Sequence, residues 1–149
     1  MRATRRIAVI GASSNRGRPS HSVFRYLVQQ GFECIPINPN EEDVLGVPAY
    51  PTLAAAVAET GRFDMVDVFR RSELCLPHAH EAVATGARVL WLQLGVVAWD
   101  AAQVAHHAGL EVVMDRCCKI EHARFFGGLR VIGLSTGVLT SRLALKIPV

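Results

Sequence analysis

Residues 7–20 read IAVIGASSNRGRPS, a short apolar run that enters a Gly-rich polar turn, and a helical pattern follows over about residues 20–30. A strand, a Gly-rich turn and a helix N-terminus in this order can bind phosphate, because free backbone N–H groups and the positive helix end point at one place. Gly11 lets the backbone approach a ligand closely, and Arg16 and Arg18 add positive charge. The segment therefore predicts an anion site for a nucleotide-like ligand.

The dinucleotide fingerprint G-x-G-x-x-G is incomplete in this turn. Gly11 occupies its first glycine position, but Ser13 and Arg16 occupy the other two. A standard NAD site is therefore disfavoured, and two interpretations of the turn stay open. We favour the interpretation that the turn holds an anion, because the first turn is the usual ligand site of such folds. The alternative is a plain strand-to-helix turn in which Gly11 is needed only for its backbone dihedral angles.

The end of the second strand candidate, residues 32–37, also departs from NAD-binding units. Such units place an acidic residue there to hold the ribose hydroxyls. Here Asn38 and Pro39 follow the strand, and an uncharged strand end tolerates a phosphorylated ribose better than a carboxylate would. Glu41 and Glu42 come slightly later, and we expect both in a solvated loop.

The composition is that of an ordinary globular protein, and the length predicts a single domain over residues 1–149. The net charge of +3 is modest and does not favour nucleic acid as a partner. No apolar run reaches the ~18 residues that a membrane span requires, and the run behind the basic N-terminus is too short for a signal peptide. We therefore expect a cytoplasmic protein with no membrane partner.

Strand and helix patterns alternate along the chain at intervals of ~25–30 residues, which is the βαβ rhythm. Further strands are expected at 65–69, 89–94 and 111–114, and further helices at 52–59, 72–85 and 98–107. Thr52 and Ser72 are the expected N-caps of the first two of these helices. The pattern predicts an α/β fold with a doubly wound, mainly parallel sheet and helices on both faces.

Ligands of such sheets bind beyond the carboxyl ends of the strands. Polar or turn-forming residues directly follow each expected strand there, at 11–13, 38–39, 69–70 and 93–95. Parallel strands bring these four segments to one edge of the sheet, which we call the carboxyl-end rim. The rim is the predicted ligand site.

Six short motifs occur in order along the chain, at residues 9–13, 18–20, 37–39, 66–70, 91–95 and 114–117. Together they resemble the small stand-alone coenzyme A (CoA)-binding proteins, which are similar to the CoA-binding domain of the succinyl-CoA synthetase alpha subunit. The resemblance covers about residues 6–126. It implies a Rossmann-like fold that binds CoA or an acyl-CoA.

Carried onto this chain, the resemblance implies a CoA site made of three groups of residues. The phosphates would lie among Gly11, Ala12, Ser13, Asn15, Arg16, Arg18 and Ser20, the adenosine beside Asn38 and Pro39, and the pantetheine arm along Phe69, Arg70, Gln93 and Gly95. The synthetase subunit also has a second domain with a phosphorylated histidine, which a chain of 149 residues is too short to contain. The resemblance therefore implies binding without ligase chemistry, and no role is assigned to the tail at 127–149.

No catalytic residues can be assigned, because the sequence supports no pairing of a nucleophile with a base. We expect a ligand-binding protein rather than an enzyme, with a protein partner or a second copy of the chain as further partners. Two alternatives stay open: an NAD(P)-dependent oxidoreductase, and an acyl-CoA-handling enzyme that acts with a partner subunit.

Residues 116–122 read RCCKIEH and allow three interpretations. A metal site is disfavoured, because adjacent cysteines rarely ligate one ion and the spacing matches no common site. A reactive thiol is a second hypothesis, in which Arg116 and Lys119 lower the pKa of Cys117 and a mixed disulfide forms with the thiol of CoA. The third, which we favour, is that an apolar cysteine packs in a loop at a strand end.

Three residues of the expected strands bear on the core. Cys34 and Trp91 lie in apolar runs, and we expect both to be buried. Asp67 interrupts an apolar strand and is either a buried structural acid or a residue of the carboxyl-end rim, with Arg70 as a candidate partner.

Overall fold

A computed structural model of the protein describes residues 1–126 and shows a five-stranded sheet in which every neighbouring pair of strands is parallel. The strand order is β2-β1-β5-β6-β7. The strands are β1 (Arg6–Ile10), β2 (Glu33–Ile37), β5 (Met65–Val68), β6 (Val89–Leu92) and β7 (Glu111–Val113). The expected doubly wound, Rossmann-like α/β fold is confirmed.

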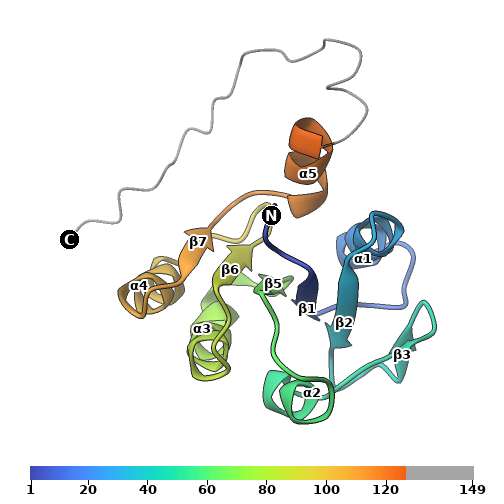
Figure 1. Ribbon diagram of the computed structural model, residues 1–149, viewed down its shortest axis with the longest axis horizontal. Coiled ribbons are helices and arrows are strands. Elements are labelled where there is room, and N and C mark those ends of the chain that lie inside the picture. The colour runs from blue at the N-terminus through green and yellow to red at the C-terminus, as the bar shows by residue number, and fades with distance from the viewer. Residues whose placement is uncertain (127–149) are drawn as a thin grey trace.

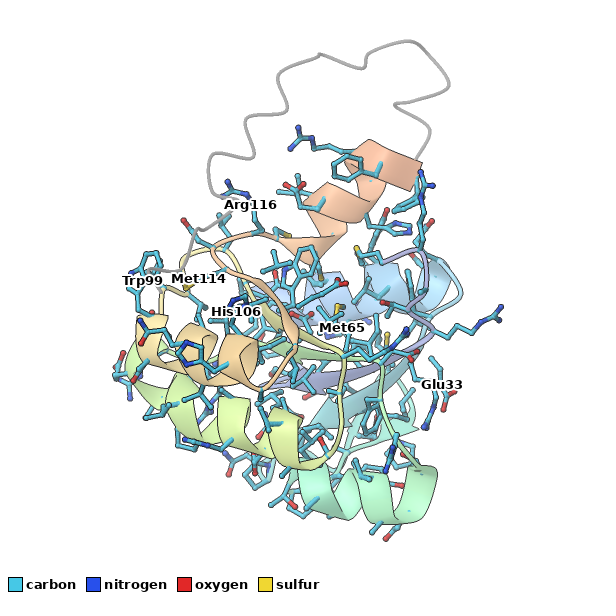
Figure 2. All side chains as sticks on the ribbon, turned by 60° about the vertical axis from the view of Figure 1, so that its left-hand side comes forward. Glu33, Met65, Trp99, His106, Met114 and Arg116 are labelled. Carbon is cyan, nitrogen blue, oxygen red and sulfur yellow. The ribbon has the colours of Figure 1, made fainter. Side chains whose placement is uncertain are left out.

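Helices cover both faces of this sheet (Figure 1). One face carries α1 (Pro19–Gln29) and α5 (Cys118–Phe126), and the other carries α2 (Leu53–Thr60), α3 (Cys75–Ala84) and α4 (Trp99–His107). Each face has its own apolar cluster, because side chains of a strand alternate between the two faces. The edges of the sheet lie on opposite sides of the molecule, where Glu33 begins β2 and Met114 follows β7 (Figure 2).

The central strands form because their side chains are apolar on both faces, as a sheet covered by helices on both sides requires. All four residues of β5 are buried, and so are Cys34 and Trp91, as expected. Thr52 is the predicted N-cap of α2, since its side chain accepts a hydrogen bond of 3.1 Å from the N–H of Ala55. Pro19 begins α1, where a missing N–H costs nothing.

Several local expectations were wrong. Ser72 does not cap a helix, because it begins the short 3-10 helix η1 (Ser72–Leu74), and α3 follows only at Cys75. The hydroxyl of Ser72 instead accepts a hydrogen bond from the N–H of Val97 on the next crossover. Strand β6 ends at Leu92, so Gln93 and Leu94 lie beyond the strand.

Two elements were not expected at all. Residues 43–48 form a small antiparallel hairpin of β3 (Asp43–Val44) and β4 (Val47–Pro48). Helix α5 follows the last strand, over residues for which the sequence analysis assigned no helix. The tail at 127–149 lies outside the described residues. Within residues 1–126, no helix is long and apolar enough to cross a membrane.

The order of the strands reverses between β1 and β5. The chain runs from β1 outward to β2 and then crosses back to β5 on the other side of β1. The connecting helices on the two sides of this point lie on opposite faces (Figure 1), and open α/β sheets bind their ligands where the strand order reverses in this way. The carboxyl-end rim therefore has its centre at the ends of β1 and β5.

Candidate functional site

Gly11 lies at this centre and has no room for a side chain. Its φ angle is +80°, in the region that favours glycine, and its N–H donates a hydrogen bond of 2.9 Å to the carbonyl of Ile37. A Cβ atom here would overlap the carbonyl oxygen of Phe69 and lie 3.3 Å from Cδ of Arg70. Gly11 is therefore required both for its dihedral angles and for the close approach of β1 to the end of β5.

The larger of two cavities at the rim measures about 440 Å³, within the usual range for small-molecule sites. It is bounded by the turn after β1, the start of α1, the ends of β5 and β6, and α5. Six residues predicted from the sequence line it: Gly11, Arg18, Ser20, Phe69, Arg70 and Gln93. Its other lining residues were not among the predicted site residues and include Arg71, Leu94, Val96, Cys117 and Ile120. Leu94 nevertheless lies in the predicted rim segment 93–95, and Cys117 was the candidate for a mixed disulfide with CoA.

A smaller cavity of about 180 Å³ lies on the other side of Gly11. The predicted residues Asn38 and Pro39 line it, together with Thr52, His78 and Glu81. Gly11 and Arg70 line both cavities. The two cavities therefore adjoin at the point where the strand order reverses, and one extended ligand could occupy both.

Three arginines of the described residues line these cavities, and one of them, Arg71, pairs with Glu73 at 3.5 Å. Arg18 and Arg70 are exposed, and neither side chain makes a hydrogen bond or an ion pair with another residue within 1–126. Arg18 is the N-cap residue of α1 but makes no side-chain cap, so its guanidinium is not needed to hold the helix end. Both guanidinium groups are available to an anion that enters the site.

Glu41 and Glu42 lie in the loop after β2, as expected, with Glu42 exposed and Glu41 partly exposed. The contacts of Glu41 were not expected: its Oε1 accepts hydrogen bonds from Oγ of Ser13 at 2.8 Å and from the N–H of Ser14 at 3.0 Å. Hydrogen bonds from Ser14 and Ser13 hold the pKa of the Glu41 carboxyl below its usual value. The outer side of the Gly-rich turn therefore already holds a carboxylate of the protein.

The remaining residues of the turn stabilise its shape. The N–H of Asn15 donates to Oγ of Ser13 at 3.1 Å, and Oδ1 of Asn15 accepts from the N–H of Gly17 at 2.9 Å. Ala12 is buried, and its carbonyl accepts a hydrogen bond of 2.8 Å from Nδ2 of Asn38. Arg16 is exposed and lines neither cavity.

Gly95 also lines neither cavity. It lies in the loop after β6, where its N–H donates a hydrogen bond of 2.8 Å to Oδ1 of Asp115. The structure thus places Gly95 beside the site, at the outer part of the rim.

Comparison with known proteins agrees with this geometry. A family model described as CoA binding domain matches residues 5–123. The chain belongs to the CoA-binding domain family. A relative from Bacillus subtilis strain 168, the uncharacterized protein YneT, is 40% identical over 123 residues, which cover 83% of this chain and 89% of YneT.

Solved structures of similar proteins have the same fold. A hypothetical protein from Pyrococcus horikoshii OT3 is 32% identical, with a TM-score of 0.78, over 83% of this chain and 84% of its own. The Thermus thermophilus protein cell-free ID.343 is 34% identical, with a TM-score of 0.77, over 83% and 91%. A dinucleotide-forming acetyl-coenzyme A synthetase from Ca. Korarchaeum cryptofilum is 20% identical over 74% of this chain and 26% of its own, with a TM-score of 0.64, and shares the fold.

In this CoA-binding domain, Asp67 is a fully buried acid in the centre of the sheet. Its partner is not Arg70, the candidate from the sequence. Its Oδ1 accepts a hydrogen bond of 2.6 Å from Nε2 of Gln93, and its Oδ2 accepts one of 3.3 Å from Sγ of Cys118. The N–H of Cys118 also donates to Oε1 of Gln93 at 3.4 Å. This buried triad ties β5, the residue after β6 and the first residue of α5 together.

Burial determines the protonation states of the two titratable groups of the triad, Asp67 and Cys118. It raises the pKa of Asp67 to about 7, and the hydrogen bonds from Gln93 and Cys118 only partly oppose this shift. Burial, together with the neighbouring Asp67, also raises the pKa of Cys118 well above its usual value. Cys118 is therefore a thiol that donates a hydrogen bond, and Asp67 titrates near neutral pH.

We predict that Asp67 makes the stability of the protein depend on pH. The folded pKa of Asp67, about 7, lies above its unfolded value of about 3.8, so the folded protein holds this proton more tightly than the unfolded chain does. The resulting contribution to the free energy of unfolding is fully present below pH 4 and is lost as the pH rises to about 7. Asp67→Asn should remove this dependence and raise the stability above pH 7 by a few kcal/mol, since one pKa unit is worth about 1.4 kcal/mol. Thermal unfolding of the unaltered protein and the variant from pH 4 to 8 measures the difference in their stability. If stability changes with pH in parallel in the two proteins, the prediction is contradicted.

Cys117 and Cys118 have different environments. Cys118 is fully buried, whereas Cys117 is partly exposed and lines the larger cavity. Nζ of Lys119 donates to Oγ of Ser22 at 3.1 Å, and the guanidinium of Arg116 donates to the carbonyl of Asp115. The expected packed cysteine is thus Cys118, and the mixed disulfide of Cys117 with CoA stays a prediction. No group of three or more potential metal ligands lies together in the described part of the chain.

We predict that iodoacetamide alkylates Cys117 alone in the folded protein. The other three cysteines are at most 4% exposed, and burial raises the pKa of Cys34 to about 12 and that of Cys75 to about 11. Mass spectrometry of tryptic peptides, with urea-unfolded protein as the control, checks this. Modification of Cys118 before Cys117 would show that α5 is not packed as described.

Helix α5 is the main part of the site that sequence reasoning missed. It contributes Ile120 to the cavity wall, and it is preceded there by Cys117. Only Cys118 and His122 are buried in this helix, so the side of it that faces the core gives little apolar signal in the sequence. The alternation of strands and helices along the chain could have predicted it, because a parallel strand such as β7 is normally followed by a helix.

Proposed function

We propose that this chain binds CoA or an acyl-CoA across the two cavities of the carboxyl-end rim, without ligase chemistry of its own. The observation that carries this proposal is that two cavities adjoin at Gly11 and Arg70, where the strand order reverses. Open α/β sheets bind their ligands at such points. Membership of the CoA-binding domain family supports CoA as that ligand.

The phosphates of CoA would lie between the two cavities. Arg70 lines both cavities and Arg18 lines the larger one, and neither side chain is paired with another residue within 1–126. Helix α1 begins at Pro19, which also lines the larger cavity. The positive helix end and the two cations favour a pyrophosphate there. The other residues of the turn, Ala12 to Arg16, would hold the backbone in the shape that exposes Gly11.

The two ends of CoA would enter different cavities. The adenosine would occupy the smaller cavity beside Asn38 and Pro39, and the pantetheine arm would occupy the larger one beside Phe69 and Gln93. The larger cavity is mostly apolar in its lining, which suits the pantetheine arm. Gly95 would contribute by ordering the loop that follows β6.

Glu41 bears on the alternative of an NAD(P)-dependent oxidoreductase. It is the first acid after β2, but its carboxylate is bound to Ser13 and Ser14 and does not line the smaller cavity, where a ribose would lie. This position does not offer the ribose contact that NAD-binding units make. An acyl-CoA-handling enzyme that acts with a partner subunit would use the same CoA site.

Isothermal titration with CoA, acetyl-CoA, NADH and NADPH tests the proposal. We expect CoA and acetyl-CoA to bind and the two nicotinamide cofactors to bind far more weakly or not at all. Binding of a nicotinamide cofactor with no binding of CoA would overturn the proposal and favour the oxidoreductase.

Arg18→Ala is the sharpest variant for the phosphate contact. We predict that it weakens CoA binding about tenfold or more, because a charge-assisted hydrogen bond is worth roughly 1.5–3 kcal/mol. The variant should fold normally, since Arg18 makes no side-chain cap. Arg25→Ala is the matched control, because Arg25 is exposed on the same helix and lines neither cavity. Equal affinities for the two variants would remove Arg18 from the site.

A further inference from the structure

Two large apolar side chains on different walls of the larger cavity are exposed to an unusual degree. Leu94, in the loop after β6, is 64% exposed, and Ile120, on α5, is 52% exposed. These two segments are far apart in the sequence, and they meet at the hydrogen bonds between Gln93 and Cys118 and at this cavity. Exposed apolar groups on facing segments of a cavity gain free energy when an apolar ligand covers them.

The surroundings of these two side chains are also apolar. Val23 and Val96 line the same cavity and are at most 8% exposed. The polar residue among them, Gln93, has its side chain occupied by Asp67 and Cys118. These residues therefore offer an apolar surface within a cavity whose charged lining residues are Arg18, Arg70 and Arg71, the last paired with Glu73 at 3.5 Å.

The cavity has two different ends. Gly11 and Arg70 mark the end that adjoins the smaller cavity, because they line both. Leu94, Val96 and Ile120 line only the larger cavity. A CoA whose phosphates lie at Gly11 would thus direct its thiol end toward the apolar residues.

We propose that this apolar end, formed by Leu94, Val96 and Ile120, binds the acyl group of an acyl-CoA, and that this group is a linear hydrocarbon chain. The proposal rests on the proposed CoA site and goes further, because it names the class of ligand. A carboxylate-bearing acyl group such as succinyl would lose hydration against Leu94, Val96 and Ile120, none of which can donate a side-chain hydrogen bond to it.

Titration with a series of acyl-CoA thioesters tests this. Affinity should rise from CoA through butyryl-CoA and hexanoyl-CoA to octanoyl-CoA, by up to about fourfold for each methylene that is buried, which corresponds to about 0.8 kcal/mol. Succinyl-CoA should bind no tighter than CoA. Equal affinities along the series, or tighter binding of succinyl-CoA, would overturn the proposal.

The same titrations separate this proposal from the proposed function. If CoA binds and the acyl chain adds nothing, the CoA site stands and the acyl site is wrong. If neither CoA nor any thioester binds, the proposed function itself fails, and the acyl site fails with it.

Leu94→Asn and Ile120→Asn test whether this apolar end of the cavity causes the gain in affinity from the acyl chain. Both side chains are more than half exposed, so the variants should fold. Because both also line the cavity proposed for the pantetheine arm, the measured quantity is the ratio of the affinities for octanoyl-CoA and CoA, and each variant should lower this ratio about tenfold. Val28→Asn is the control, because Val28 is 40% exposed on α1 and lines neither cavity. If both cavity variants keep the gain from the octanoyl chain, these side chains cover another partner and the proposal is wrong.

Discussion

The ligand site depends on how closely the ends of β1 and β5 approach each other. The backbone of Gly11 lies directly against the carbonyl of Phe69, and no side chain fits between them. Because this contact involves only backbone atoms at Gly11 and Phe69, no side chain of Gly11 fills the space beside it, and a cavity lies on each side of Gly11. Arg70 follows at once and lines both cavities, so one backbone contact positions the two cavities and a cation between them.

A second constraint lies below the larger cavity. Asp67 is buried in the central strand, where a carboxyl group is costly unless it is protonated or well hydrogen-bonded. Its bonds to Gln93 and Cys118 join the sheet to the start of α5. Since Gln93 lines the cavity and α5 supplies Ile120 to its wall, this buried triad sets the shape of the end that would receive the acyl group.

The sequence allowed the parallel sheet and many of the rim residues to be predicted, because apolar runs and turn residues are local signals. Thr52 is an example, since its hydroxyl accepts a hydrogen bond from the N–H of Ala55, three residues later. The turn at Gly11 was also predicted, but its close contact with Phe69 is made by the fold. Glu41 and Ser72 could not be predicted, because their partners lie on other segments and only the fold brings them together. Helix α5 was missed because few of its side chains face the core.

The most direct test of the central claim is a titration of CoA into isotope-labelled protein, followed by the backbone amide chemical shifts. If the carboxyl-end rim is the ligand site, the largest changes will occur at residues 11–13, 38, 69–70 and 93–95, with further changes at Cys117. Changes confined to α4 and to the amino-terminal ends of the strands, with none at Gly11, would contradict the account.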